Sequence, residues 1–178
     1  MGPQLKMMMR WLMGGGGGEF EYFPRDIVLQ QHQGAAETYD KISREGDYKV
    51  TTTMVDEQGA VAPCLTPVAE LNPVILRELR AHVGRFAQGR ILRLTLLREA
   101  TQIVSIQFPA IDDEGTAIQV SVYNQTGGKI LSKAQLRRLY PEGSRVLVMH
   151  PYVKRLRGGM PSLQVDHPHN VVTQISEG

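Results

Sequence analysis

Cysteine is almost absent from this chain of 178 residues, since Cys64 is the only one. One cysteine cannot form an intrachain disulfide, and it cannot supply the several thiolates of a structural zinc site. Such cysteine usage is typical of a reducing compartment. We therefore expect an intracellular protein, cytoplasmic or nuclear, with an organelle leader as the alternative.

Long apolar runs are also lacking. The apolar segment at residues 7–13 is too short for a membrane span or for the core of a secretory signal. We therefore expect no membrane partner.

A strong net charge is missing too, because 20 Lys and Arg residues stand against 18 Asp and Glu residues. The balance is uneven along the chain. Residues 85–178 hold 12 Lys and Arg against 7 Asp and Glu, a net charge of +5. A local basic excess fits an anionic partner, and it fits an ordinary solvated surface equally well.

Composition divides the chain into three parts. Five consecutive glycines at residues 14–18 predict a flexible tail over residues 1–18. Residues 19–70 form an extension without a clear fold, in which residues 35–43 have a weak helical pattern and residues 48–54 alternate like a strand. We expect residues 71–176 to form a helix followed by a β domain.

Residues 72–83 carry the signals of a helix. Asn72 is a favoured N-cap, and Pro73 would occupy the first helical position, where its missing N–H costs nothing. The apolar residues recur at helical spacing, and Gly84 provides a stop. They are Ile75, Leu76, Leu79 and Val83.

Beyond Gly89 the apolar period changes to two, which predicts strands. The alternating residues are Leu92, Leu94 and Leu96, then Val104, Ile106 and Phe108, then Ile118, Val120 and Val122. Residues 112–115 have turn chemistry, so the second and third strands form a hairpin. Ser132 can cap a short helix over residues 132–139. Two more strands follow, at residues 145–156 with an interruption at Pro151 and at residues 163–166.

The order strand, strand, strand, helix, strand, strand is that of the oligonucleotide/oligosaccharide-binding (OB) fold. We therefore predict a mainly β protein with a five-stranded OB-like Greek-key barrel. One helix precedes the barrel and another lies between its third and fourth strands. Leu92, Val104 and Val120 are expected to fill the interior. An α+β sandwich is the alternative.

Four short segments after the helix at residues 71–83 carry a resemblance to a known family. They read Gly-Arg-Ile-Leu-Arg at 89–93, Tyr-Pro-Glu-Gly-Ser at 140–144, His-Pro-Tyr-Val-Lys at 150–154 and Leu-Gln-Val-Asp-His-Pro at 163–168. Together they resemble the N-terminal region of tetratricopeptide-repeat proteins that carry a SET domain. The resemblance implies an OB-like barrel linked to a lysine methyltransferase. The helical repeats and the asparagine-histidine-cysteine signature of the SET site are absent here, so no catalytic residue is carried over.

Catalytic and metal-binding patterns are weak. His167 and His169 flank a proline beside Asp166, a spacing that points poorly at a common ion. Cys64 has no nucleophile signature around it, and the acids at 112–114 suit a solvated turn. We expect no catalytic residue, no metal and no cofactor, and therefore no enzyme.

The OB groove lies on the outer face of the second and third strands and between the flanking loops. Its candidate residues here are Arg93, Thr95, Arg98, Ser105, Gln107, Gln119, Ser121, Tyr123, Tyr152, Lys154, Arg155 and Arg157. Only Tyr123, with help from Tyr152, could stack a base, so a protein partner is favoured over nucleic acid. The sequence predicts a non-enzymatic binding or adaptor module linked to a SET system. The alternatives are binding of single-stranded DNA or RNA through basic loops, and an N-terminal fragment of a repeat-containing SET methyltransferase.

Overall fold

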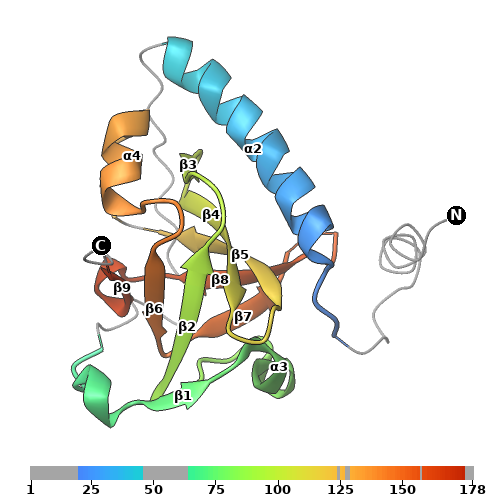
Figure 1. The fold of residues 1–178 in the computed structure, drawn as a ribbon, viewed down its shortest axis with the longest axis vertical. Coiled ribbons are helices and arrows are strands. Elements are labelled where there is room, and N and C mark those ends of the chain that lie inside the picture. Colours follow the sequence, from blue (N-terminus) through green and yellow to red (C-terminus); the bar gives the residue numbers. More distant parts are fainter. Residues whose placement is uncertain (1–19, 46–63, 124, 127–128, 157, 175–178) are drawn as a thin grey trace, which may run out of the picture.

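A single sheet dominates the protein, with helices α2, α3 and α4 around it (Figure 1). The computed structural model describes residues 20–45, 64–123, 125–126, 129–156 and 158–174. Within these residues the expected mainly β class is confirmed. The predicted tail at residues 1–18 and the strand-like segment at 48–54 lie outside the described residues.

Nine strands pair within the described residues in the order β7-β8-β5-β4-β2-β6-β9, with β1 added beside β2 and β3 beside β4. Their bounds are β1 Asn72–Val74, β2 Arg90–Leu96, β3 Thr101–Gln102, β4 Ile106–Asp112, β5 Ala117–Val122, β6 Arg145–Met149, β7 Tyr152–Arg155, β8 Pro161–Val165 and β9 Val171–Gln174.

The helices are α2 (Arg25–Glu45), α3 (Leu76–Leu79) and α4 (Lys133–Leu139), with 3-10 turns at Val68–Glu70, Arg80–His82 and Pro168–Asn170. The helix predicted after the third strand is confirmed as α4. Ser132 accepts a hydrogen bond from the Gln135 backbone N–H, and the Gln135 side chain accepts one from the Ser132 backbone N–H. This reciprocal capping box explains why the helix begins there. Helix α2 contains the weak pattern at residues 35–43 and is much longer than it.

The predicted strand order is present inside this larger sheet. β4 and β5 form the expected antiparallel hairpin, β5 runs parallel to β8, and β2 runs antiparallel to both β4 and β6. Two details differ from a five-stranded barrel. Additional strands extend the sheet. The sheet is also open, because among the described residues β7 and β9 are its two end strands and do not pair with each other.

The fourth predicted strand is divided into β6 and β7 by His150 and Pro151. His150 has a left-handed backbone (φ 49°), and its ring Nδ1 accepts a hydrogen bond from the Gly89 N–H at 2.9 Å. The bend turns β7 away from β2. Residues 84–87 then cover the outer edge of β7, since Gly84 and Ala87 donate backbone hydrogen bonds to Val153 and Pro151.

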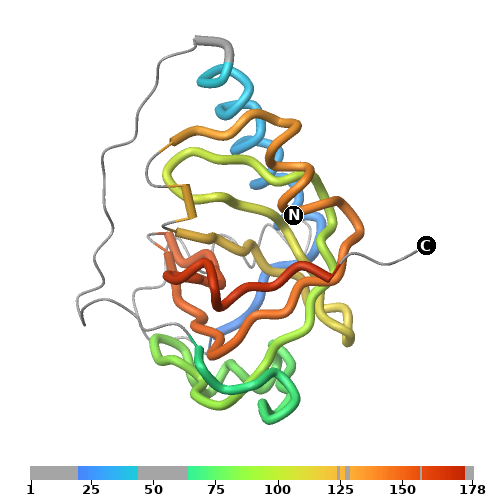
Figure 2. The backbone as a smooth tube through the Cα atoms, turned by 90° about the vertical axis from the view of Figure 1, so that its left-hand side faces the viewer, coloured from blue at the N-terminus to red at the C-terminus, as the bar shows by residue number. Residues whose placement is uncertain are grey.

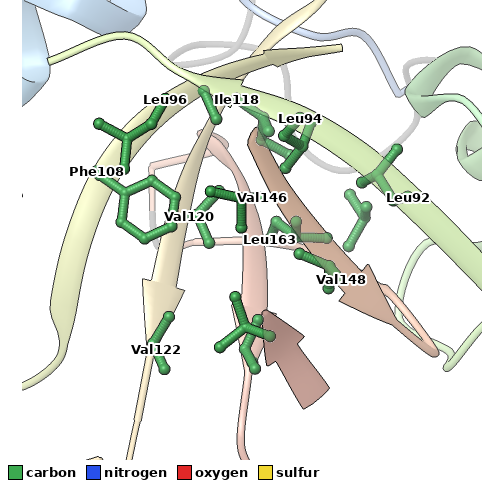
Figure 3. Close-up of a cluster of buried hydrophobic side chains, with 14 of the residues drawn as sticks. Leu92, Leu94, Leu96, Phe108, Ile118, Val120, Val122, Val146, Val148 and Leu163 are labelled. Carbon is green, nitrogen blue, oxygen red and sulfur yellow. The ribbon is translucent and has the colours of Figure 1, made fainter. Parts of the chain in front are cut away.

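The core lies between the curved walls of this sheet, where inward side chains of several strands meet (Figure 3). Leu92, Phe108 and Val120 are completely buried. Val104, which the alternation placed with them, is 44% exposed. The prediction for Val104 is wrong because the strand begins only at Ile106, after a turn in which Ile103 N–H donates to Ser105 O.

The helix predicted from Asn72 is also placed wrongly. Asn72–Val74 is strand β1, parallel to β2, and helix α3 begins only at Leu76. Pro73 is tolerated in β1 because an edge strand can do without one N–H. The Arg90 guanidinium donates to the carbonyls of Asn72 and Pro73, which fixes β1 against β2.

The segment after β8, where the sequence predicted no further strand, contains a 3-10 turn and strand β9 (Pro168–Asn170 and Val171–Gln174). β9 pairs antiparallel with β6. Its four residues are too short to give a clear alternating pattern, so pairing with β6 rather than local sequence determines the strand.

Candidate binding surface

A row of four polar side chains crosses the outer face of the sheet. In the strand registers Gln107 pairs with Ser121, Ser121 with Gln164, and Gln164 with Tyr152. Directly paired residues point to the same side of a sheet, and the residues one position further along each strand are core residues. Gln107, Ser121, Gln164 and Tyr152 therefore form one outward polar row over β4, β5, β8 and β7.

Further polar groups adjoin the polar row. The Gln107 amide donates to Ser105 Oγ at 3.3 Å, and the Gln164 amide donates to Asp166. Tyr123 lies close to both neighbours: it hydrogen-bonds with Ser105, while burial and the charge of Asp166 raise the pKa of its hydroxyl. Ser105, Ser121 and Gln164 are buried, so the partly exposed Gln107, Tyr123 and Tyr152 are the members that can offer polar groups to a ligand.

Helix α2 covers the adjacent part of the same outer face, over β3, β4 and β5. Its His32 ring donates from Nε2 to the Glu99 carbonyl at 2.7 Å and accepts at Nδ1 from the Gln119 amide at 3.1 Å. Gln119, one of the predicted binding residues, is 5% exposed beneath it. The predicted groove is thus occupied by a segment of the same chain.

The contact has an apolar end and a polar end. Phe23, Ile27 and Val28 pack with Ala117 of β5 and with Met160. At the other end the Tyr39 hydroxyl donates to the Leu131 carbonyl at 2.6 Å, and the end of α2 lies beside α4 (Figure 2). We call the contacting residues of the β domain the α2 seat: Glu99, Ala117, Gln119, Leu131 and Met160.

We expect docking of α2 to weaken in acid through His32. Burial lowers the pKa of His32, with the positive charge of Arg98 contributing, while its hydrogen bond to Glu99 O opposes the shift. The stabilising contribution is therefore complete above the ordinary pKa of about 6.5 and is lost as the pH falls through the lower pKa of the docked ring. Hydrogen exchange of the α2 amides at pH 8 and pH 5 measures the loss.

The charged neighbours do not reverse this sign. Glu99 follows Arg98, but its carboxylate is paired with Arg137 of α4 at 2.7 Å. If His32 were protonated, the Gln119 amide could rotate and accept a hydrogen bond from Nδ1 through its oxygen. The charged ring would still be removed from water, so its pKa stays lowered. His32→Gln serves as the control, since it cannot titrate. An equal acid-induced loss in His32→Gln would assign the effect to another group.

The predicted cations do not line one groove. Arg93 and Thr95 of β2 pair with Leu147 and Arg145 of β6, on a different part of the outer surface. Arg98 donates to the Leu97 carbonyl, and the Arg155 guanidinium lies 5.3 Å from the centre of the Phe20 ring. Lys154 of β7 is in the same outward row as Gln119, beside the polar row, because both residues pair with Ser162. Arg157 lies outside the described residues.

An open cleft of about 520 Å³ lies away from the polar row, between residues 21–25, α3 and the β4–β5 turn. Arg25, Arg77 and Arg80 line it together with Glu21 and Glu114. Arg77 is paired with Glu114 at 3.2 Å, and Arg80 donates from Nε to the Phe20 carbonyl. The charges in this cleft are largely balanced.

Sequence reasoning missed the polar row's Gln164 and most of α2, of which it predicted only a weakly helical segment at residues 35–43. A signal for the rest of α2 existed, because Ile27, Val28 and Tyr39 follow a helical spacing. Polar residues at 30–33 and Gly34 interrupt it. Gln164 enters the row only through the parallel pairing of β5 with β8, which no local pattern reveals.

Two structural findings bear on other kinds of site. The described residues contain no group of three or more His, Cys, Asp and Glu side chains that could hold a metal ion. No helix among them combines the length and apolar character needed to cross a membrane.

Comparisons with known proteins give distant similarities. A Gibberella zeae protein named methyltransferase is 23% identical over 155 residues, covering 81% of this chain and 20% of that protein. The chain therefore spans about a fifth of the length of this relative. No family model matches the chain.

Three solved structures match part of this chain, each with low sequence identity. The tetrameric p202 HIN2 has a TM-score of 0.40 and 13% identity over 57% of this chain and 49% of its own. Schizosaccharomyces pombe Pot1pC bound to single-stranded DNA has a TM-score of 0.36 and 9% identity, over 49% of this chain and 79% of its own. The OB domain of Ta0387 from Thermoplasma acidophilum has a TM-score of 0.38 and 15% identity, and the match covers 58% of this chain and 87% of that domain.

Proposed function

We propose that this chain is a non-enzymatic module of OB-like architecture that binds proteins through the outer face of β4, β5, β8 and β7. The observation that carries the proposal is the position of α2. A helix of polypeptide, held by apolar packing at one end and by hydrogen bonds to backbone carbonyls at the other, already covers the part of this face formed by β4 and β5.

The inventory of side chains favours protein over single-stranded nucleic acid. Stacking on aromatic rings and a continuous cationic track are the main sources of single-strand affinity. Here Tyr152 packs its ring on Phe86 with centres 4.7 Å apart, and Tyr123 is partly buried. Lys154 adjoins the polar row, but Arg93 lies beside β6 and Arg155 alternates to the opposite side of β7, so phosphates along one strand would not meet successive cations.

The link to a methyltransferase system belongs to the same proposal. It is supported by the resemblance of residues 71–172 to the region before a SET domain and by the name of the Gibberella zeae relative. In this reading the module serves as an adaptor and contributes no catalytic group.

Titration with a labelled single-stranded oligonucleotide at low and high salt tests the choice of ligand. We expect a dissociation constant no tighter than about 100 µM, in the range of weak non-specific binding. The double variant Lys154→Ala with Arg155→Ala should bind the same oligonucleotide equally weakly. Micromolar or tighter affinity that falls steeply with salt, and that the double variant loses, would make nucleic acid the ligand.

A further inference from the structure

We propose that the α2 seat is a helix-binding groove, that α2 is its internal ligand, and that an amphipathic helix of a partner protein replaces α2 there. This inference rests on the proposed protein-binding function and specifies the partner. The partner's chemistry can be read from the contacts that α2 makes.

The apolar end of the seat sets the first requirement. Phe23, Ile27 and Val28 are each at least 93% buried, and their partners on the β domain are Ala117 and Met160. Ile27 and Val28 lie in the first turns of α2, whereas Phe23 precedes the helix and packs beside them. A partner helix therefore needs two aliphatic side chains near its start and an apolar side chain just before it.

The polar end sets the second requirement. His32 and Tyr39 donate to the backbone carbonyls of Glu99 and Leu131, and they are seven residues, or two helical turns, apart. Backbone carbonyls accept from any suitably placed donor. A partner helix with donor side chains five and twelve positions after the residue that replaces Ile27 can satisfy both acceptors.

Helix α2 itself is an imperfect occupant. Gly34 lies in its middle, and an added Cβ would meet nothing within 4 Å, so no close packing requires glycine there. Glycine destabilises a helix interior relative to alanine. Among the described residues the Oε1 atoms of Gln31 and Gln119 are buried without a hydrogen-bond partner. A helix without these defects would hold the seat more firmly.

A labelled synthetic peptide of residues 20–45 is the probe, added to the full chain. Because the chain's own α2 competes for the α2 seat, the apparent affinity for the peptide is proportional to the fraction of molecules in which α2 has left the seat. Val28→Asp in the chain removes an apolar contact of α2 and should raise the affinity for the wild-type peptide by tenfold or more, as expected when the open fraction is small. Gly34→Ala strengthens α2 and should lower the affinity about two- to fivefold.

Two matched controls locate the binding. A peptide carrying Val28→Asp should not bind any of these chains. Ala117→Arg, combined with Val28→Asp in the chain, should abolish the gain, because it fills the seat from the β5 side. A thermal unfolding transition shows whether the Val28→Asp chain stays folded. If the Val28→Asp chain is unfolded, the Gly34→Ala chain provides the test. That change stabilises α2, so a lower affinity for the peptide supports the inference.

Equal affinity of the peptide for the wild-type, Val28→Asp and Gly34→Ala chains would overturn the inference. So would an opened chain that captures a single-stranded oligonucleotide and not the peptide. Tight oligonucleotide binding by the unmodified chain would instead refute the proposed function itself. The two failures are therefore distinguishable.

Discussion

Replacing Asp112 with alanine should lower the free energy of unfolding by about 4 kcal/mol, a large share of the stability of a domain of this size. Asp112 is 5% exposed at the end of β4. One carboxylate oxygen accepts from the backbone N–H groups of Glu114 and Thr116, at 3.1 and 2.9 Å. The other accepts from the N–H of Leu76 at 3.0 Å, at the start of α3.

The magnitude follows from what the alanine leaves behind. Hydrogen bonds to a charged group contribute about 1.5 to 3 kcal/mol each, and a buried donor without an acceptor keeps its desolvation cost. The Leu76 N–H is the buried member of the three. Losing its acceptor should also release α3, so exchange of the Leu76 amide should accelerate more than that of the strand amides.

The neighbouring acid provides the control. Asp113 is exposed and makes an ion pair with Arg145 at 3.0 Å. Exposed pairs contribute at most about 1 kcal/mol, so Asp113→Ala should be nearly neutral. Urea unfolding of both variants measures the difference, and equal losses would contradict the role assigned to Asp112.

Asp112 shows what local sequence can and cannot predict. Its position in the turn of the β4–β5 hairpin followed from the residues at 112–115. Its partner Leu76 is 36 residues away, so the same acid was read as solvated. The alternation of β2, β4 and β5 and the cap of α4 were likewise local signals, and the structure confirms those elements.

Elements defined by distant partners were misread or missed. β1 exists because it pairs with β2, and the capping signal at Asn72 pointed instead to a helix. The binding face was predicted from alternation along each strand, which correctly put Gln107 and Ser121 on one side. It could not show that α2 lies over Gln119, because that contact joins residues 87 positions apart.

A second large effect is expected at Gln102. Its substitution by alanine should lower the free energy of unfolding by about 3 kcal/mol. Gln102 is 3% exposed in β3. Its amide nitrogen donates to Thr126 Oγ1 at 3.1 Å and to the Lys129 carbonyl at 2.9 Å, and its oxygen accepts from the Leu131 N–H at 2.7 Å. One side chain thus holds the segment between β5 and α4.

This loss should reach α2, because the Leu131 carbonyl is the acceptor for the Tyr39 hydroxyl. Thr126→Ala is the matched control, since it removes one of the three hydrogen bonds and should cost about 1 kcal/mol. Urea unfolding gives the two free energies, and hydrogen exchange of the last turns of α2 reports the coupling. If Gln102→Ala costs no more than Thr126→Ala, or leaves exchange in α2 unchanged, then Gln102 does not position the Leu131 carbonyl and the polar end of the α2 seat is held by other contacts.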